Sequence, residues 1–185
     1  IENYFEGLIK NVNYDANNTT EFKNNKKNFE LHSALGYFAK LGMYKEDIIN
    51  NNFHSLTPKF LLRYAPGHMR NTGNQGSRLS YANLFNLNKV DEFDVLEPGL
   101  STSIGFEYKK NKLNEKNEIA NEVLTLSAGQ VISAKENMDI PSRSSLDQQF
   151  SDVVGEAKYN VNKNINLNYN FSIDQGYKNF NFNEV

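Results

Sequence analysis

The segment Ile165–Ile173, INLNYNFSI, alternates strictly between apolar and polar residues. Every second residue is apolar, and each residue between them is Asn or Ser. Successive side chains of a β-strand point to opposite sides of a sheet, so this alternation predicts a strand with one apolar and one amide face. In a soluble sheet the apolar face meets a core, whereas in a membrane barrel it meets lipid and the polar face lines a wet lumen. The alternation alone leaves both possibilities open.

The same period of two recurs along the whole chain. In Tyr4–Ala16 it groups Leu8, Val12, Tyr14 and Ala16 on one side. The other alternating segments are Phe29–Met43, Pro58–Pro66, Leu100–Tyr108, Glu122–Ala134, Val153–Val161 and a last partial one, Tyr177–Val185. Several match or exceed the roughly 9–11 residues that a strand needs to cross a bilayer, and none shows a helical period. The pattern predicts an all-β, antiparallel, up-and-down meander of about eight long strands, a segment of a large transmembrane β-barrel.

The connections between these segments differ in length in a regular way. Asn162-Lys163 predicts a tight turn, Lys45–Ser55 and Asn111–Asn121 are moderate, and Arg70–Pro98 and Lys135–Gln149 are long. The two long connections fall at one end of the predicted sheet and the tight turn at the other, as in outer-membrane barrels with short periplasmic turns and longer extracellular loops. We therefore expect Arg70–Pro98 to be extracellular. Its apolar residues are too many for a solvated loop and should pack against another part of the molecule: Leu79, Tyr81, Leu84, Phe85 and Leu87.

Composition narrows the class of protein. The chain has 185 residues, a net charge of −2 and no cysteine, which argues against a basic nucleic-acid binder and against a disulfide framework. No apolar run approaches the roughly 18 residues of a transmembrane helix. Asn is abundant, but it falls in register with aromatic residues instead of forming the uniform tracts of a low-complexity chain. The chain starts at Ile1 and stops within an alternating pattern, so we expect residues 1–185 to be a fragment of a single outer-membrane β-barrel domain.

Catalytic and metal-binding patterns are weak. The three histidines, His32, His54 and His68, are not at ligand spacing, and no serine sits in a G-x-S-x-G motif. Four acids of the long connection could hold a divalent ion, although solvated carboxylates are the commoner case: Asp91, Glu92, Asp94 and Glu97. We expect no enzyme activity, no metal and no cofactor.

The barrel interpretation assigns each alternating side chain to lumen or lipid. The expected lumen-facing residues are Lys59, Arg63, Ser101, Ser103, Glu107, Asn164, Asn166, Asn168 and Asn170, together with Glu156, Lys158 and Ser172. The expected lipid-facing residues of the last full strand are Ile165, Leu167, Tyr169, Phe171 and Ile173. Amides and hydroxyls both donate and accept hydrogen bonds, so such a wall suits sugar hydroxyls, and it equally suits water alone.

Several landmarks, taken in order, resemble one family. They are a T-P-x-x-x-L-x-Y-x-P strand at Thr57–Pro66, an ANLF segment at Ala82–Phe85, a GQ strand end at Gly129-Gln130, and a Y-x-x-N hairpin at Tyr159–Asn162. The chain thereby resembles the middle part of the C-terminal barrel of the LptD family, the lipopolysaccharide-assembly proteins, in an Asn- and Lys-rich alphaproteobacterial form.

The resemblance implies a translocon component in the outer membrane of a Gram-negative bacterium. Its implied partners are lipopolysaccharide, an LptE-type lipoprotein plug, outer-membrane lipid, and a periplasmic Lpt bridge that is reached through an N-terminal domain outside this segment. Two alternatives stay open at this point: another outer-membrane barrel, porin-like or small and closed, and a soluble Asn-rich β adhesin.

Overall fold

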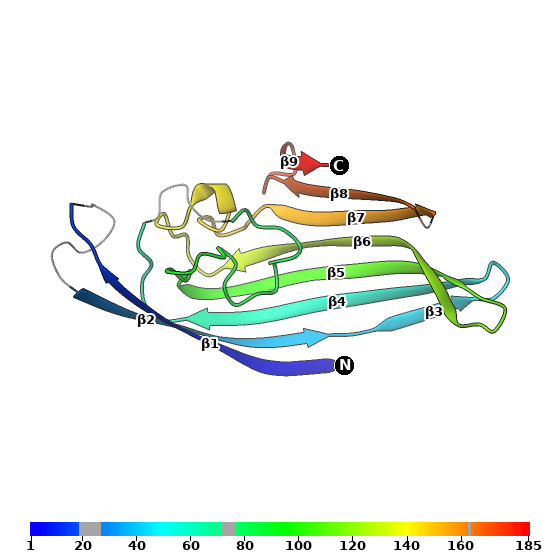
Figure 1. The fold of residues 1–185 in the computed structure, drawn as a ribbon, viewed down its shortest axis with the longest axis horizontal. Helices are drawn as coiled ribbons and strands as arrows, with labels where there is room; N and C mark the ends of the chain where they lie inside the picture. The colour runs from blue at the N-terminus through cyan, green and yellow to red at the C-terminus, as the bar shows by residue number, and fades with distance from the viewer. Residues whose placement is uncertain (19–26, 72–76, 163) are drawn as a thin grey trace.

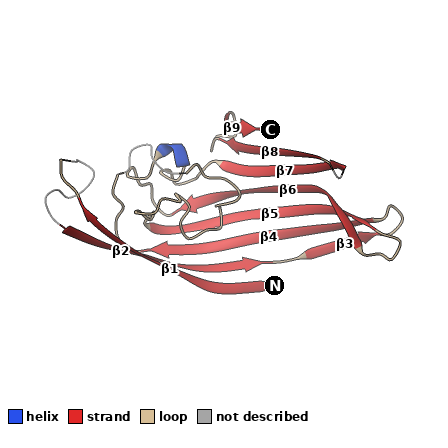
Figure 2. Ribbon diagram, viewed as in Figure 1, coloured by secondary structure: helices blue, strands red, loops and turns tan. Residues whose placement is uncertain are grey.

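A computed structural model describes residues 1–18, 27–71, 77–162 and 164–185. Within these ranges the chain forms a single nine-stranded antiparallel sheet, shown in Figures 1 and 2. The strands are β1 (Glu2–Asp15), β2 (Lys27–Lys40), β3 (Met43–Asp47), β4 (Asn52–Ala65), β5 (Gly99–Leu113), β6 (Ile119–Ser133), β7 (Val153–Asn162), β8 (Ile165–Ile173) and β9 (Phe180–Glu184). The only helix among the described residues is one 3-10 turn, Ser142–Ser144.

Strands that are neighbours in sequence are neighbours in space. The order is β1-β2-β4-β5-β6-β7-β8-β9, and β3 pairs with β4 beyond the end of β2. β2 and β3 therefore act as one long strand with an interruption at Leu41-Gly42, so nine strands fill eight positions across the sheet. The predicted antiparallel meander is confirmed, and the sheet is open between β1 and β9 (Figure 1).

Two predicted connections were too long. Strand pairing continues through Lys45–Asp47 and Asn52–Ser55, which leaves only residues 48–51 between β3 and β4. Likewise β5 extends to Leu113 and β6 begins at Ile119. Polar residues occupy these strand ends, so the apolar alternation fades there while the ladder of backbone hydrogen bonds continues.

The connections are sorted between the two ends of the sheet. Residues 66–71 and 77–98, which we call the connection 66–98, lie at one end together with residues 134–152, and the described parts of the short β3–β4, β5–β6 and β7–β8 turns lie at the other (Figure 1). We call these the loop end and the turn end. Asn162, predicted to lie in the tight turn, is the last residue of β7, Asn164 lies in the β7–β8 turn, and Lys163 lies outside the described residues.

The connection 66–98 lies back across one face of the sheet (Figure 1). We call the face that it covers the inner face, and the opposite one the outer face. Two apolar clusters fill the space between this connection and the strands. The first includes Leu79, Leu84 and Val131, and the second includes Leu61, Leu87 and Leu96. Tyr81 and Phe85 pack at their margins, so the predicted packing of this connection is confirmed.

Among the described residues, no helix combines the length and the apolar character that a membrane-spanning helix requires.

Candidate functional site on the inner face

The register brings most of the expected lumen residues onto the inner face. Directly paired residues of antiparallel strands share a face, which links Glu107 to Ser127, Ser127 to Glu156, and Glu156 to Asn170. The same parity places Lys59, Arg63, Ser101, Ser103, Lys158, Asn166, Asn168 and Ser172 on this face. Asn164 lies in the turn before β8, outside the strand ladder.

The connection 66–98 divides the inner face into a covered and an open part. Arg63 and Ser103 are buried beneath it, so they do not face an open lumen as single solvated residues. Towards the turn end, Glu156, Lys158 and the amides of β8 remain accessible. The open part is therefore the surface that a ligand on this face would meet.

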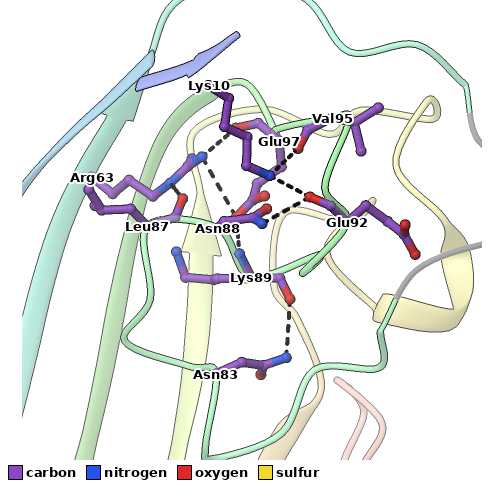
Figure 3. A network of polar contacts seen from close by, with 9 residues as sticks. All are labelled: Lys10, Arg63, Asn83, Leu87, Asn88, Lys89, Glu92, Val95 and Glu97. Carbon is purple, nitrogen blue, oxygen red and sulfur yellow. Dashed lines mark hydrogen bonds and ion pairs between the residues drawn. The ribbon is translucent and has the colours of Figure 1, made fainter. Parts of the chain in front are cut away.

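Arg63 holds the covering connection to the sheet (Figure 3). Its Nε donates to the Leu87 carbonyl at 2.7 Å, and its Nη2 donates to the Glu97 carbonyl at 2.6 Å. The Glu97 carboxylate lies 3.7 Å from the same guanidinium and accepts the Lys89 backbone N–H at 2.7 Å. Arg63 is 1% exposed and Glu97 5%, so the pair is desolvated and depends on these partners, while the second carboxylate oxygen of Glu97, Oε2, is buried without a hydrogen-bond partner.

Two lysines complete the cluster. Lys10 of β1 donates from Nζ to the Val95 carbonyl at 2.9 Å and also to the Glu92 carbonyl. Lys89 is 1% exposed, and its burial lowers its pKa to about 8 even though Glu97 and Glu6 oppose that shift. The backbone around Lys89 is fixed by Asn83, whose Nδ2 donates to the Lys89 carbonyl at 3.1 Å (Figure 3).

Glycines in the sheet make room for this connection. A Cβ at Gly36 would lie 2.6 Å from Leu87 Cδ2, and one at Gly129 would lie 2.4 Å from Leu84 Cδ2. A Cβ at Gly105 would lie 3.2 Å from Phe85 Cζ. Leu84, Phe85 and Leu87 thus pack directly on backbone, which is why the connection sits flat against three strands.

The open part of the inner face carries charges of alternating sign. Lys59 and Lys109 both lie within 4 Å of Glu107, at 3.6 and 3.5 Å, and Lys158 lies 3.0 Å from Glu156. Lys59 Nζ also lies 5.4 Å from the centre of the Tyr81 ring. Lys109 also lies 3.9 Å from Glu122, so three lysines face three carboxylates, and the neutral amides of Asn166, Asn168 and Asn170 continue the surface across β8. Such a wall can exchange hydrogen bonds with hydroxyl groups without attracting ions of one sign.

The expected lipid-facing residues share the outer face. Leu167, Tyr169, Phe171 and Ile173 pair there with apolar or small neighbours of β7, Ile165 pairs with Asn162, and Ile165 and Leu167 are each 49% exposed. Phe171 lies against Gly155, where an added Cβ would come within 2.3 Å of its ring. In β1 the apolar group Leu8, Val12 and Tyr14 lies on the inner face instead, and Phe5 and Ile9 occupy the outer face.

The acidic group of the long connection is mostly engaged by the protein itself. Glu97 pairs with Arg63, and Asp94 pairs with Arg70. Among the described residues no three His, Cys, Asp or Glu side chains are arranged to hold a metal ion. Sequence reasoning treated Glu97 as one of four solvated acids, and in the structure it is a buried partner. It also missed the inward roles of Lys10 and Lys89, because a lysine in a polar stretch gives no sign of burial.

Comparison with protein-family models gives a match over most of the chain. A family model described as LptD, LPS transport system D, matches residues 8–185. No curated protein matches the chain.

Proposed function

Because the chain belongs to the LptD family and carries a role in lipopolysaccharide transport, we propose that residues 1–185 form one wall of an outer-membrane barrel that guides lipopolysaccharide to the outer leaflet. The protein would lie in the outer membrane of a Gram-negative bacterium, in the alphaproteobacterial form of the family. The proposal contains no catalytic step.

The observation that carries the proposal is the contrast between the two faces of one sheet. From Leu56 to Tyr64, β4 covers roughly 27 Å at about 3.3 Å per residue, and its outer side chains Leu56, Phe60, Leu62 and Tyr64 are apolar and exposed. On its inner side, Thr57, Lys59 and Arg63 are hydrogen-bonding groups, and the one apolar side chain, Leu61, is buried beneath the connection 66–98. If the outer face met water, its apolar side chains would stay exposed to solvent. If the inner face met hydrocarbon, its polar groups would lack hydrogen-bond partners, at a cost of several kcal/mol per buried polar group. A lipid-facing wall around a wet interior suits both.

We assign partners by the face that each would meet. Lipopolysaccharide sugars would pass along the open inner part between Lys158 and Asn170, and membrane lipid would contact the outer face. An LptE-type lipoprotein plug would face the same interior, and a periplasmic Lpt bridge would deliver the cargo through a domain outside this chain.

Photo-crosslinking in the full-length protein in cells tests this assignment. A photoreactive residue at Asn168 or Asn170 should form adducts with lipopolysaccharide sugar or with the plug lipoprotein, and one at Tyr169 or Phe171 should form adducts with acyl chains. Mass spectrometry separates the two kinds of adduct. Sugar adducts at Phe171 combined with acyl adducts at Asn168 would contradict the proposal.

A further inference from the structure

Charged side chains on the outer face are confined to its two ends. At the loop end, Asp15 of β1 pairs in register with Lys27 of β2. At the turn end, Lys45, His54, Lys110 and Lys112 share the outer face with a single acid, Asp47. Every other charged strand residue that the structure describes lies on the inner face. We call Lys45, Lys110 and Lys112 the cationic rim.

The cationic rim borders the apolar band directly. Lys45 pairs with His54, and His54 pairs with Lys110, across β3, β4 and β5. The next outer row towards the loop end is Met43, Leu56 and Tyr108. His54 Nδ1 lies 2.7 Å from the Tyr108 hydroxyl, which gives the edge of the band a polar handle. Tyrosine at the edge of an apolar belt, followed by lysine, is the order of groups found at a membrane–water interface.

The lysines of the rim differ from those of the inner face in their partners. Inner lysines Lys40, Lys59, Lys109 and Lys158 each have a carboxylate within 4 Å. Among the described residues, no ion pair is formed by Lys45, Lys110 or Lys112, and Lys45 and Lys112 are exposed. The Asp47 carboxylate instead accepts hydrogen bonds from Asn50, at 3.2 and 2.8 Å. Asp47 also attracts Lys45 over a longer distance, so among the described residues one acid faces the three lysines of the rim and leaves a net positive charge there.

We propose that the cationic rim binds the headgroups of anionic phospholipids in the leaflet at the turn end of the sheet. The proposal rests on the membrane placement given under Proposed function. Lysines beside a bilayer surface are attracted to anionic lipid, and their apolar stems can lie along the band while their ammonium groups reach the phosphates. Zwitterionic lipid, which has no net charge, would gain little from the same contacts.

The test uses the full-length protein in phosphatidylcholine nanodiscs, into which phosphatidylglycerol is titrated and counted by native mass spectrometry. The variant Lys45→Gln/Lys110→Gln/Lys112→Gln should lose about tenfold or more in affinity for phosphatidylglycerol, since three attractive charges are removed. A matched control, Lys40→Gln/Lys135→Gln/Lys178→Gln, removes the same charge from positions off the rim. The control should bind phosphatidylglycerol as the wild type does.

Two outcomes would overturn the inference: unchanged phosphatidylglycerol binding by the rim variant, or an equal loss in the control. Unchanged lipid binding together with loss of an acidic co-purifying protein would also overturn it, in favour of a protein partner. Membrane residence of the wild-type protein is measured separately by fractionation. If the wild type resides in the outer membrane and the rim variant keeps its lipid, only this inference fails. If the wild type is absent from the membrane, the proposed function fails.

Discussion

Arg63 and Glu97 form a charged pair that water barely reaches, beneath the connection 66–98. Removing two charges from water is costly, and their attraction offsets this cost only when further hydrogen bonds satisfy both groups. Here the guanidinium reaches two carbonyls as well as the carboxylate, and the carboxylate accepts a backbone N–H. Removing one member of the pair should therefore destabilise the protein much more than removing both.

Replacing Arg63 with Met should destabilise the docked connection by about 3–5 kcal/mol, because the Glu97 carboxylate stays buried without its partner. Limited proteolysis of the full-length protein in detergent should then cleave within residues 77–98. The double variant Arg63→Met/Glu97→Leu should recover much of the protection. Lys158→Met, which breaks the half-exposed pair with Glu156, should change stability by about 0–1 kcal/mol. Equal effects of Arg63→Met and Lys158→Met would contradict the buried clamp.

The low pKa of Lys89 should make the stability of the connection 66–98 depend on pH. Burial lowers the pKa of the Lys89 amine to about 8 in the docked connection, from an ordinary value of 10.5. Between these two values the unfolded state binds more protons than the folded state, so stability should rise as pH increases through this window. Below about pH 8 this residue should contribute no slope. Thermal unfolding of wild type and Lys89→Met across pH 7–10.5 checks this, since the difference between them should change only above about pH 8.

At the scale of the element, each strand has to serve two environments at once. The side-chain period of two makes the register of β8 all-or-nothing, because a slip by one residue would move every side chain to the other face. The pairs Glu156 with Asn170 and Gly155 with Phe171 fix that register. Residues paired across neighbouring strands form rows, which give each side chain a position between the loop end and the turn end. Phe171 lies in the row of Phe106, and Leu167 lies nearer the turn end, in the row of Lys110.

Arginine scanning of β8 should reveal both the face and the depth. Phe171→Arg should cost roughly 2–4 kcal/mol, as expected near a bilayer midplane, and Leu167→Arg should cost less because its row reaches the rim. Asn168→Arg should scarcely change folding. Phe171→Leu separates the loss of the ring over Gly155 from the burial of charge. Urea unfolding of the full-length protein in lipid vesicles gives the free energies, and an Asn168→Arg as damaging as Phe171→Arg would refute the assigned faces.

Gly129 should tolerate no side chain. A Cβ there would meet Leu84 Cδ2 at 2.4 Å and the Ile104 carbonyl oxygen at 2.5 Å, and backbone cannot yield as a flexible side chain can. Gly129→Ala should cost about 1–3 kcal/mol through overpacking and should expose the connection 66–98 to protease. Gly7→Ala is the matched control, because its Cβ would make only an ordinary contact of 3.6 Å with Leu35 Cδ2. Protection of the connection in Gly129→Ala would show that the sheet can adjust there.

At the scale of the whole molecule, sequence alternation was a good guide to the strands and a poor one to what covers them. It predicted the meander and which side chains of β4, β5 and β8 share a face, because apolar and polar residues largely alternate there, and the assignment of these faces to lipid and lumen stays a prediction. It failed in β1, where Leu8 and Ile9 are both apolar and lie on opposite faces. The apolar content of the connection 66–98 indicated that it packs against the molecule. The place on the sheet where it packs depends on Arg63 and on three glycines from separate strands, and no local sequence pattern reveals that these residues come together.

The topology predicts which ends of the sheet are reachable from outside the cell. Phe93 is 84% exposed in the connection at the loop end, and Asn117 lies in the β5–β6 turn at the opposite end. The segment has no cysteine of its own, so Phe93→Cys and Asn117→Cys each add one thiol to it. A membrane-impermeant maleimide should label Phe93→Cys on intact cells and Asn117→Cys only after permeabilisation. The reverse pattern would invert the topology.

The contact between Lys10 and Val95 spans 85 positions of the chain, and it also has a consequence for folding kinetics. Contacts between distant parts of a chain form slowly, because closing a long loop lowers the chain entropy before the contact can stabilise the structure. The connection 66–98 can dock only after β1, β2, β4 and β5 have paired. Its docking is therefore a late folding step that marks the completed pairing of these strands. In a pulse-labelled folding experiment, amide protection of residues 87–97 should appear last and in one phase. Lys10→Met should delay that phase and leave the earlier pairing of β4 with β5 unchanged.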